Sequence, residues 1–127
     1  MCSVLERLND IKTAIATIRE LLNDRTFEDA VVDKVTRLAV ERCVEIVSEA
    51  SKHIPAEMKS TIGANIPWRS VAGTGDILRH AYHRGEFEAI WSIYTNDLDP
   101  LEAVIDAMLA NLDPDKNPSA PPAQPSS

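Results

Sequence analysis

The chain has 127 residues, enough for one domain with a hydrophobic core but too few for two. Its formal net charge of −7 excludes binding of nucleic acid over a broad positively charged surface, so any RNA contact must come from a local basic patch. The sequence contains no apolar run of membrane-spanning length, no signal-peptide pattern and no CxxC motif. These features predict a cytoplasmic protein with no membrane contact.

Apolar residues recur at every third or fourth position and predict helices along most of the chain. The first expected helix covers residues 4–22. Thr26 is expected to cap a short helix with its hydroxyl group, and Asp33 to cap the helix after it. Pro55 is expected to end that helix. Its apolar stripe consists of Val35, Leu38, Ala39, Cys43, Ile46, Val47 and Ala50.

The second half of the chain continues the helical pattern. Pro67 fits the first turn of a helix, and Gly73 and Gly75 are expected to interrupt it. A last apolar stripe covers residues 87–112, in which Pro100 must kink or restart the helix, with Asp99 as the cap. That stripe consists of Phe87, Trp91, Tyr94, Leu98, Leu101, Ile105, Met108 and Leu112.

These patterns predict an all-α fold, a bundle of four to five helices. No alternating pattern of a β-strand is present. We expect the helical domain to cover residues 1–112. Residues 113–127 hold five prolines and no large apolar side chain, so we expect a disordered tail there.

Titratable and basic residues gather after Gly75. If this stretch is helical, they share an arc of about 160° opposite the apolar positions. The residues on this arc are Asp76, Arg79, His80, Tyr82 and His83. The cluster is compatible with the solvent face of an amphipathic helix, with a metal site at Asp76, His80 and His83, or with acid–base chemistry on a phosphodiester. Spacing alone does not choose among the three.

Three sequence blocks, taken together, resemble the HepT-like branch of the HEPN superfamily. The blocks are RTFEDAVVDKVTRLAVERCVEIVSEASKHIP, IPWRSVAG and HAYHRGEFEAIW, in that order, and the resemblance covers about residues 4–112. It implies a small all-α homodimer of the HEPN type that works with a nucleotidyltransferase antitoxin. It also implies a metal-independent endoribonuclease whose signature is an Arg, four to six residues, a His, one residue and a Tyr.

The resemblance implies roles for individual residues. The signature His falls on His80 and the Tyr on Tyr82, where the family's antitoxin attaches adenylate. The signature Arg falls on Gly75, which carries no charge, and the Asn that usually follows it is Asp76. Arg79, one turn after Gly75, is the predicted replacement for the missing cation.

We therefore predict the toxin of a toxin–antitoxin system, a ribonuclease that cleaves RNA without a metal or cofactor. His80, Arg79 and Asp76 are the candidate catalytic residues, and Tyr82 is the candidate site of adenylylation. Candidate contacts to RNA or nucleotide are Arg69, His83 and Arg84. The alternative is a catalytically silent HEPN dimer that binds nucleotide or a nucleotidyltransferase partner, with Gly75 marking the lost activity.

Overall fold

A computed structural model describes the backbone of residues 3–79 and 84–112, and the side chains of residues 3–75 and 87–112. The described residues form helices and no strand, which confirms the all-α class. The helices are α1 (Val4–Leu22), α2 (Phe27–Val32), α3 (Lys34–Ser51), α4 (Ala56–Thr61), α5 (Trp68–Arg79), α6 (Arg84–Asn96) and α7 (Leu98–Leu112).

The described part thus contains seven helices, more than the four to five predicted. Helix α2 is the short helix expected after Thr26, and the division of the last apolar stripe between α6 and α7 is the restart expected near Pro100. Helix α4 was not predicted, because its six residues carry too few turns for the apolar period to reveal it.

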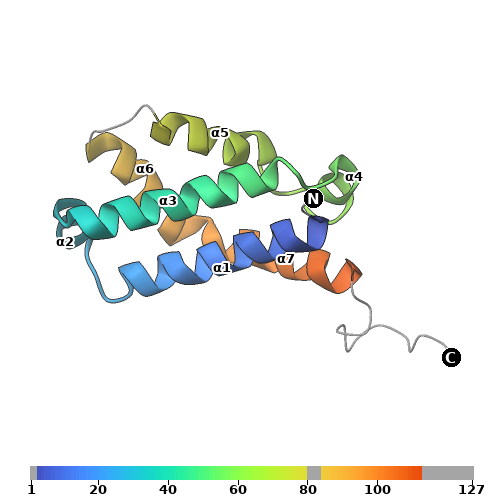
Figure 1. The fold of residues 1–127 in the computed structure, drawn as a ribbon, viewed down its shortest axis with the longest axis horizontal. Coiled ribbons are helices and arrows are strands. Elements are labelled where there is room, and N and C mark those ends of the chain that lie inside the picture. The colour runs from blue at the N-terminus through green and yellow to red at the C-terminus, as the bar shows by residue number, and fades with distance from the viewer. Residues whose placement is uncertain (1–2, 80–83, 113–127) are drawn as a thin grey trace, which may run out of the picture.

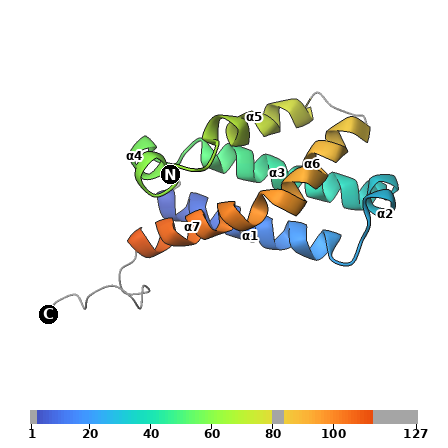
Figure 2. The ribbon, with the colours of Figure 1, turned by 180° about the vertical axis from the view of Figure 1, so that it is seen from behind.

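Helix α3 lies at the centre of the bundle. It packs against α1 on one side and α5 on the other, while α7 lies along α1 (Figures 1 and 2). Helix α6 leads from the far end of α5 back to α7, crossing behind α3 in Figure 1. The largest fully buried side chains between these helices are aliphatic apart from Phe87: Leu8, Ile11, Ile15, Ile18, Leu22, Ile90, Ile105 and Met108.

Both predicted caps are confirmed. The Thr26 hydroxyl accepts a hydrogen bond of 3.1 Å from the backbone N–H of Asp29 at the start of α2. The Asp33 carboxylate accepts one of 3.2 Å from the backbone N–H of Thr36 at the start of α3. Each bond satisfies a backbone donor that has no acceptor inside its own helix.

The glycines do not interrupt the helix that contains them, contrary to the prediction. Helix α5 runs without a break from Trp68 to Arg79 and includes both Gly73 and Gly75. A single glycine in a helix costs only about 1 kcal/mol relative to alanine, and packing of α5 on α3 outweighs that cost.

The restart near Pro100 is confirmed, but its cap lies two residues earlier than predicted. Helix α6 ends at Asn96 and α7 begins at Leu98, so that Asp97 separates them. The backbone carbonyl of Asp97 accepts the first helical bond of α7, from the N–H of Leu101, at 3.2 Å. Pro100 lies in the first turn, where a missing N–H removes no helical bond.

Part of the predicted α3 stripe faces solvent. Val35 is 77% exposed and Leu38 is 50% exposed, and Val32 at the end of α2 is 76% exposed. The two valines lie beside the α2–α3 junction, where no other helix covers that side of α3 among the described residues. The spacing of apolar residues therefore predicts more buried positions at the N-terminal end of α3 than the structure has.

Ion pairs join α1 to α7 on the outside of the bundle. Arg19 pairs with Asp99 and Glu102, and Lys12 pairs with Glu102 at 3.3 Å and with Asp106 at 2.8 Å. The hydrogen bond from Arg19 lowers the pKa of Glu102, while the hydrogen bond to Asp106 raises the pKa of Lys12. None of the described helices combines the length and apolarity needed to cross a bilayer.

Candidate functional site

Helix α5 ends at Arg79 and α6 begins at Arg84, and this junction of α5 and α6 lies at one end of the bundle (Figure 1). The backbones of Asp76 and Arg79 belong to α5, and that of Arg84 begins α6. The side chains of these three, and all of His80, Tyr82 and His83, lie outside the described residues.

Arg69 lies apart from this junction. It occupies the first turn of α5, ten residues before Arg79, which corresponds to about 15 Å along the helix axis. Its side chain is exposed and makes no ion pair within the part of the chain that the structure describes. Arg69 is therefore separated along α5 from the C-terminal end at Arg79.

Gly75 is buried in the contact between α5 and α3. A Cβ atom added to it would lie 2.7 Å from the Oγ and 3.0 Å from the Cβ of Ser48. The Ser48 hydroxyl accepts a hydrogen bond of 3.0 Å from the backbone N–H of Gly75 and donates one of 2.6 Å to the carbonyl of Ala72. The helices approach too closely here for any side chain at residue 75.

This contact explains the departure from the signature. An arginine at residue 75 would have to displace α5 from α3, because the nearest atoms belong to the buried Ser48 and to the α3 backbone. Glycine is therefore part of the packing between α5 and α3. Gly73 differs, since a Cβ there would meet nothing within 4 Å.

The IPWR block anchors the start of α5. The Trp68 indole N–H donates a hydrogen bond of 2.8 Å to the carbonyl of Gly63, and the Lys59 ammonium lies 5.5 Å from the ring centroid. Ile66 is buried beside it. The Trp68 ring is thus held by the fold and is not a free surface for stacking bases.

Aromatic side chains anchor the start of α6. Phe87 is fully buried, three residues after Arg84, with its ring 5.8 Å from that of Phe27 on α2 and 6.5 Å from that of Trp91. Trp91 also packs at 5.2 Å against Tyr94. The signature segment is therefore held at both ends, by the Gly75–Ser48 contact before it and by Phe87 after it.

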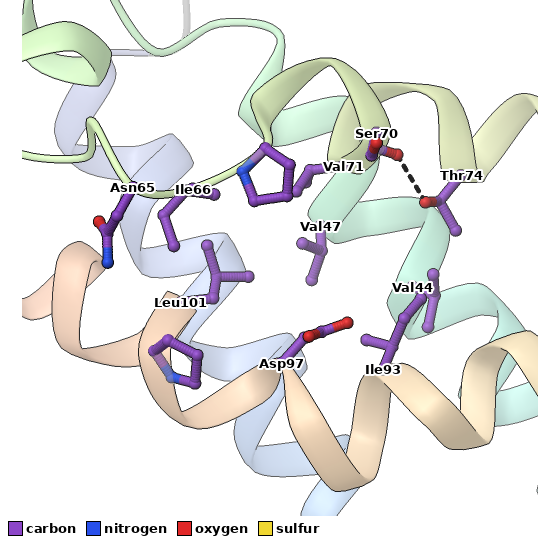
Figure 3. A pocket seen from close by; sticks show the side chains of 12 residues that line it. Val44, Val47, Asn65, Ile66, Ser70, Val71, Thr74, Ile93, Asp97 and Leu101 are labelled. Atoms are coloured by element: carbon purple, nitrogen blue, oxygen red, sulfur yellow. Dashed lines mark hydrogen bonds between the residues drawn. The ribbon is translucent and has the colours of Figure 1, made fainter.

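A groove of about 220 Å³ lies between α3, α5 and the α6–α7 junction (Figure 3). Its buried lining is apolar, including Val44, Val47 and Leu101, and its exposed lining includes Ser70 and Asp97. Asp97 is the only charged residue among the described residues that line it. A phosphate group would find no cation in this groove, so it does not fit the RNA backbone.

The described residues contain no cluster of three His, Cys, Asp or Glu side chains that could hold a metal ion. The metal alternative considered from the sequence involves Asp76, His80 and His83, whose side chains lie outside the described part. That alternative is open to the chelator experiment described below.

Residues 11–108 match the protein family described as Ribonuclease HepT-like, which is most of the chain. The chain belongs to this family. The HepT-like match spans helices from α1 to α7 and includes the whole signature segment. It confirms the resemblance seen in the three sequence blocks.

Several relatives of this HepT-like chain carry related names. A probable ribonuclease HepT of Thermococcus cleftensis is 40% identical over 95 residues, covering 75% of this chain and 86% of the relative. A putative RNase of Methanocaldococcus jannaschii is 33% identical over 102 residues, covering 77% of this chain and 84% of that protein.

A third relative, a gamma-glutamylcyclotransferase and putative RNase of the same archaeon, is 33% identical over 110 residues. This match covers 87% of the HepT-like chain but only 49% of that protein. No solved structure matches the chain.

Sequence reasoning missed Ser48. The spacing of apolar residues in α3 places Ser48 on the buried side of the helix, beside Val44 and Val47. A small polar residue in such a place gives no sign of its own that it contacts another helix. The available signal was on the other helix, in Ala72 and Gly75, which are small residues three positions apart and so share one side of α5.

Proposed function

We propose that this chain is a metal-independent endoribonuclease and the toxin of a toxin–antitoxin system. The observation that carries the proposal is the match of residues 11–108 to a ribonuclease family, in a chain that has His80 and Tyr82 directly after α5. The ribonuclease names of the similar proteins support the same activity.

The chemistry follows from the residue types. His80 takes the proton from a ribose 2′-hydroxyl, or delivers one to the leaving 5′-oxygen. The 2′-oxygen attacks the phosphorus and the bond from phosphorus to the 5′-oxygen breaks, which leaves a cyclic phosphate and a free 5′-hydroxyl. Negative charge grows on the phosphoryl oxygens during attack, and Arg79 offsets it. Asp76 orients His80.

Arg79 is the proposed cation because residue 75 has no room for one. Arg79 is the last residue of α5 and lies four positions after Gly75, on the same side of the helix and immediately before His80. Arg84, His83 and the exposed Arg69 extend the contact to RNA. In a homodimer, a second copy of these groups adds to the same site.

Tyr82 is the proposed target of the antitoxin. A nucleotidyltransferase partner attaches adenylate to its hydroxyl, which places a phosphate and a bulky base beside His80. The added negative charge repels the RNA backbone and the base blocks access.

The absence of an arginine at residue 75 favours one alternative, a silent HEPN dimer that binds nucleotide or a nucleotidyltransferase. In that case the protein would bind its partner and would not cleave RNA under any condition. Cleavage therefore separates the two functions.

The test is cleavage of labelled RNA by the purified chain in excess chelator, with added magnesium as the comparison. Cleavage is expected in chelator and is expected to disappear in His80→Ala. His53→Ala is the matched control, because His53 is an exposed histidine at the end of α3 and makes only a local contact of 3.6 Å with Glu49. A requirement for metal would replace this proposal with the metal site at Asp76, His80 and His83.

A further inference from the structure

We infer that Ser48 is a positioning residue of the ribonuclease site: its hydroxyl fixes α5 on α3 in the register that delivers His80. This inference rests on the proposed function, because it assigns Ser48 a part in that reaction. Ser48 itself lies outside the signature, on α3.

The Ser48 hydroxyl acts as both a hydrogen-bond acceptor and a hydrogen-bond donor toward α5. It accepts from the Gly75 N–H at 3.0 Å and donates to the Ala72 carbonyl at 2.6 Å. Both partners are backbone groups inside α5, which already have helical neighbours, so the contact is not needed to satisfy the helix. The contact instead fixes the position of α5 along α3.

Burial makes this relation rigid. Ser48 is only 2% exposed and Gly75 is buried. A Gly75 Cβ would lie 2.7 Å from the Ser48 Oγ and 3.0 Å from the Ser48 Cβ, so the two helices are in close contact at this point. A hydrogen bond in such a dry contact is stronger than one in water.

The contact lies close to the reacting group along the chain. Gly75 precedes His80 by five residues in the sequence, and Arg79, the last residue of α5, lies about 6 Å along the helix axis from Gly75. The intervening residues up to Arg79 are helical, so a shift or rotation of α5 at Gly75 is passed on to the residue that follows. Misplacing a catalytic group by about 1 Å can cost about 100-fold in rate.

The experiment compares Ser48→Ala with Ser51→Ala. Ser51 is a fair control because it is also a fully buried serine of α3, but its hydroxyl donates within its own helix, to the Ser48 carbonyl at 2.7 Å. We expect kcat for RNA cleavage to fall by about 10–100-fold in Ser48→Ala, with KM within about twofold, and to stay unchanged in Ser51→Ala. Equal kcat values in the two variants would overturn the inference.

A second variant breaks the same contact from α5. Gly75→Ala is expected to lower kcat by a similar factor, while Gly73→Ala, in open space on the same helix, leaves it unchanged. If Ser48→Ala does not fold, this pair decides the matter in the same way: an active Gly75→Ala overturns the inference.

Failure of the proposed function gives a different result. If the unmodified chain cleaves no RNA in any condition, the ring resonances of His80 are compared by nuclear magnetic resonance. A shift in Ser48→Ala but not in Ser51→Ala supports positioning of that residue by Ser48. Unshifted His80 resonances in both variants rule positioning out.

Discussion

The two glycines of α5 are expected to respond in opposite ways to the same substitution. Alanine has a higher helix propensity than glycine by about 0.5–1 kcal/mol, and Gly73 has open space around its Cβ direction. Gly73→Ala should therefore raise the free energy of unfolding by up to about 1 kcal/mol.

At Gly75 the new methyl group would lie 2.7 Å from the Ser48 Oγ and 3.0 Å from its Cβ. The Oγ can rotate away, but the Cβ is fixed to the α3 backbone, so α5 has to move. Overpacking of this kind costs about 1–3 kcal/mol, and the lost hydrogen bonds cost about 1 kcal/mol more. After the gain in propensity, Gly75→Ala should lower the free energy of unfolding by about 1–3 kcal/mol.

The assays are urea denaturation and thermal melting of both variants beside the unmodified protein, with equal urea slopes as evidence that the same state unfolds. The midpoint temperatures should differ by about 10 °C between Gly73→Ala and Gly75→Ala, since 1 kcal/mol corresponds to about 4 °C for a chain of this size. The double variant Ser48→Gly/Gly75→Ala removes both colliding atoms and should recover part of the loss. A Gly75→Ala variant as stable as Gly73→Ala would refute the close contact.

Three further expectations concern the signature tyrosine, the α1–α7 ion pairs and the tail. Co-expression with a nucleotidyltransferase antitoxin should add the mass of one or more adenylates to the intact chain, and Tyr82→Phe should abolish the gain; an unmodified mass beside an active transferase would contradict the role of Tyr82. Because bonding to Arg19 lowers the pKa of Glu102, the stability from this pair is complete above the unfolded pKa of about 4.3 and is lost as pH falls through the lower folded value. Glu102→Gln should thus cost about 1 kcal/mol at pH 7 and little at pH 2 in thermal melts, whereas an equal loss at both values would show that charge is not the cause. Deleting residues 114–127 should leave the melting temperature unchanged within error, since no large apolar group is lost, and a clear fall would show that the tail docks on the fold.

The helix class could be read from the sequence because each long helix repeats its apolar residues every three or four positions. The stripe of α1, from Val4 to Leu22, coincides with the helix and with its buried residues. The caps at Thr26 and Asp33 were equally readable, since a side-chain oxygen just before a helix can accept a hydrogen bond from a backbone N–H of the first turn.

The response of α5 to its glycines could not be read in the same way. Propensity favours a break at Gly73 and Gly75, but the decisive fact is the distance between two helices that are 27 residues apart at the Ser48–Gly75 contact. The distance between two helices cannot be read from the residues of either helix alone. For the same reason, the sequence showed a missing arginine at residue 75 without showing that the packing has no room for one.

The candidate site was partly predictable. The spacing of Asp76, Arg79 and His80 placed them on one segment, and the structure places the backbones of the first two on α5. The supports on either side, Ser48 and Phe87, were not predictable, because their roles come from contacts across the bundle.

The most direct test of the account is the single-turnover rate of RNA cleavage by Arg79→Ala beside Arg42→Ala. Both variants lose one arginine from the acidic chain, but Arg42 is 71% exposed on α3 and pairs only locally, with Glu45 at 3.4 Å. If Arg79 replaces the cation that residue 75 cannot carry, its loss should slow cleavage by about 10²–10³-fold, while Arg42→Ala cleaves at the unmodified rate. Equal rates for the two variants would contradict the account.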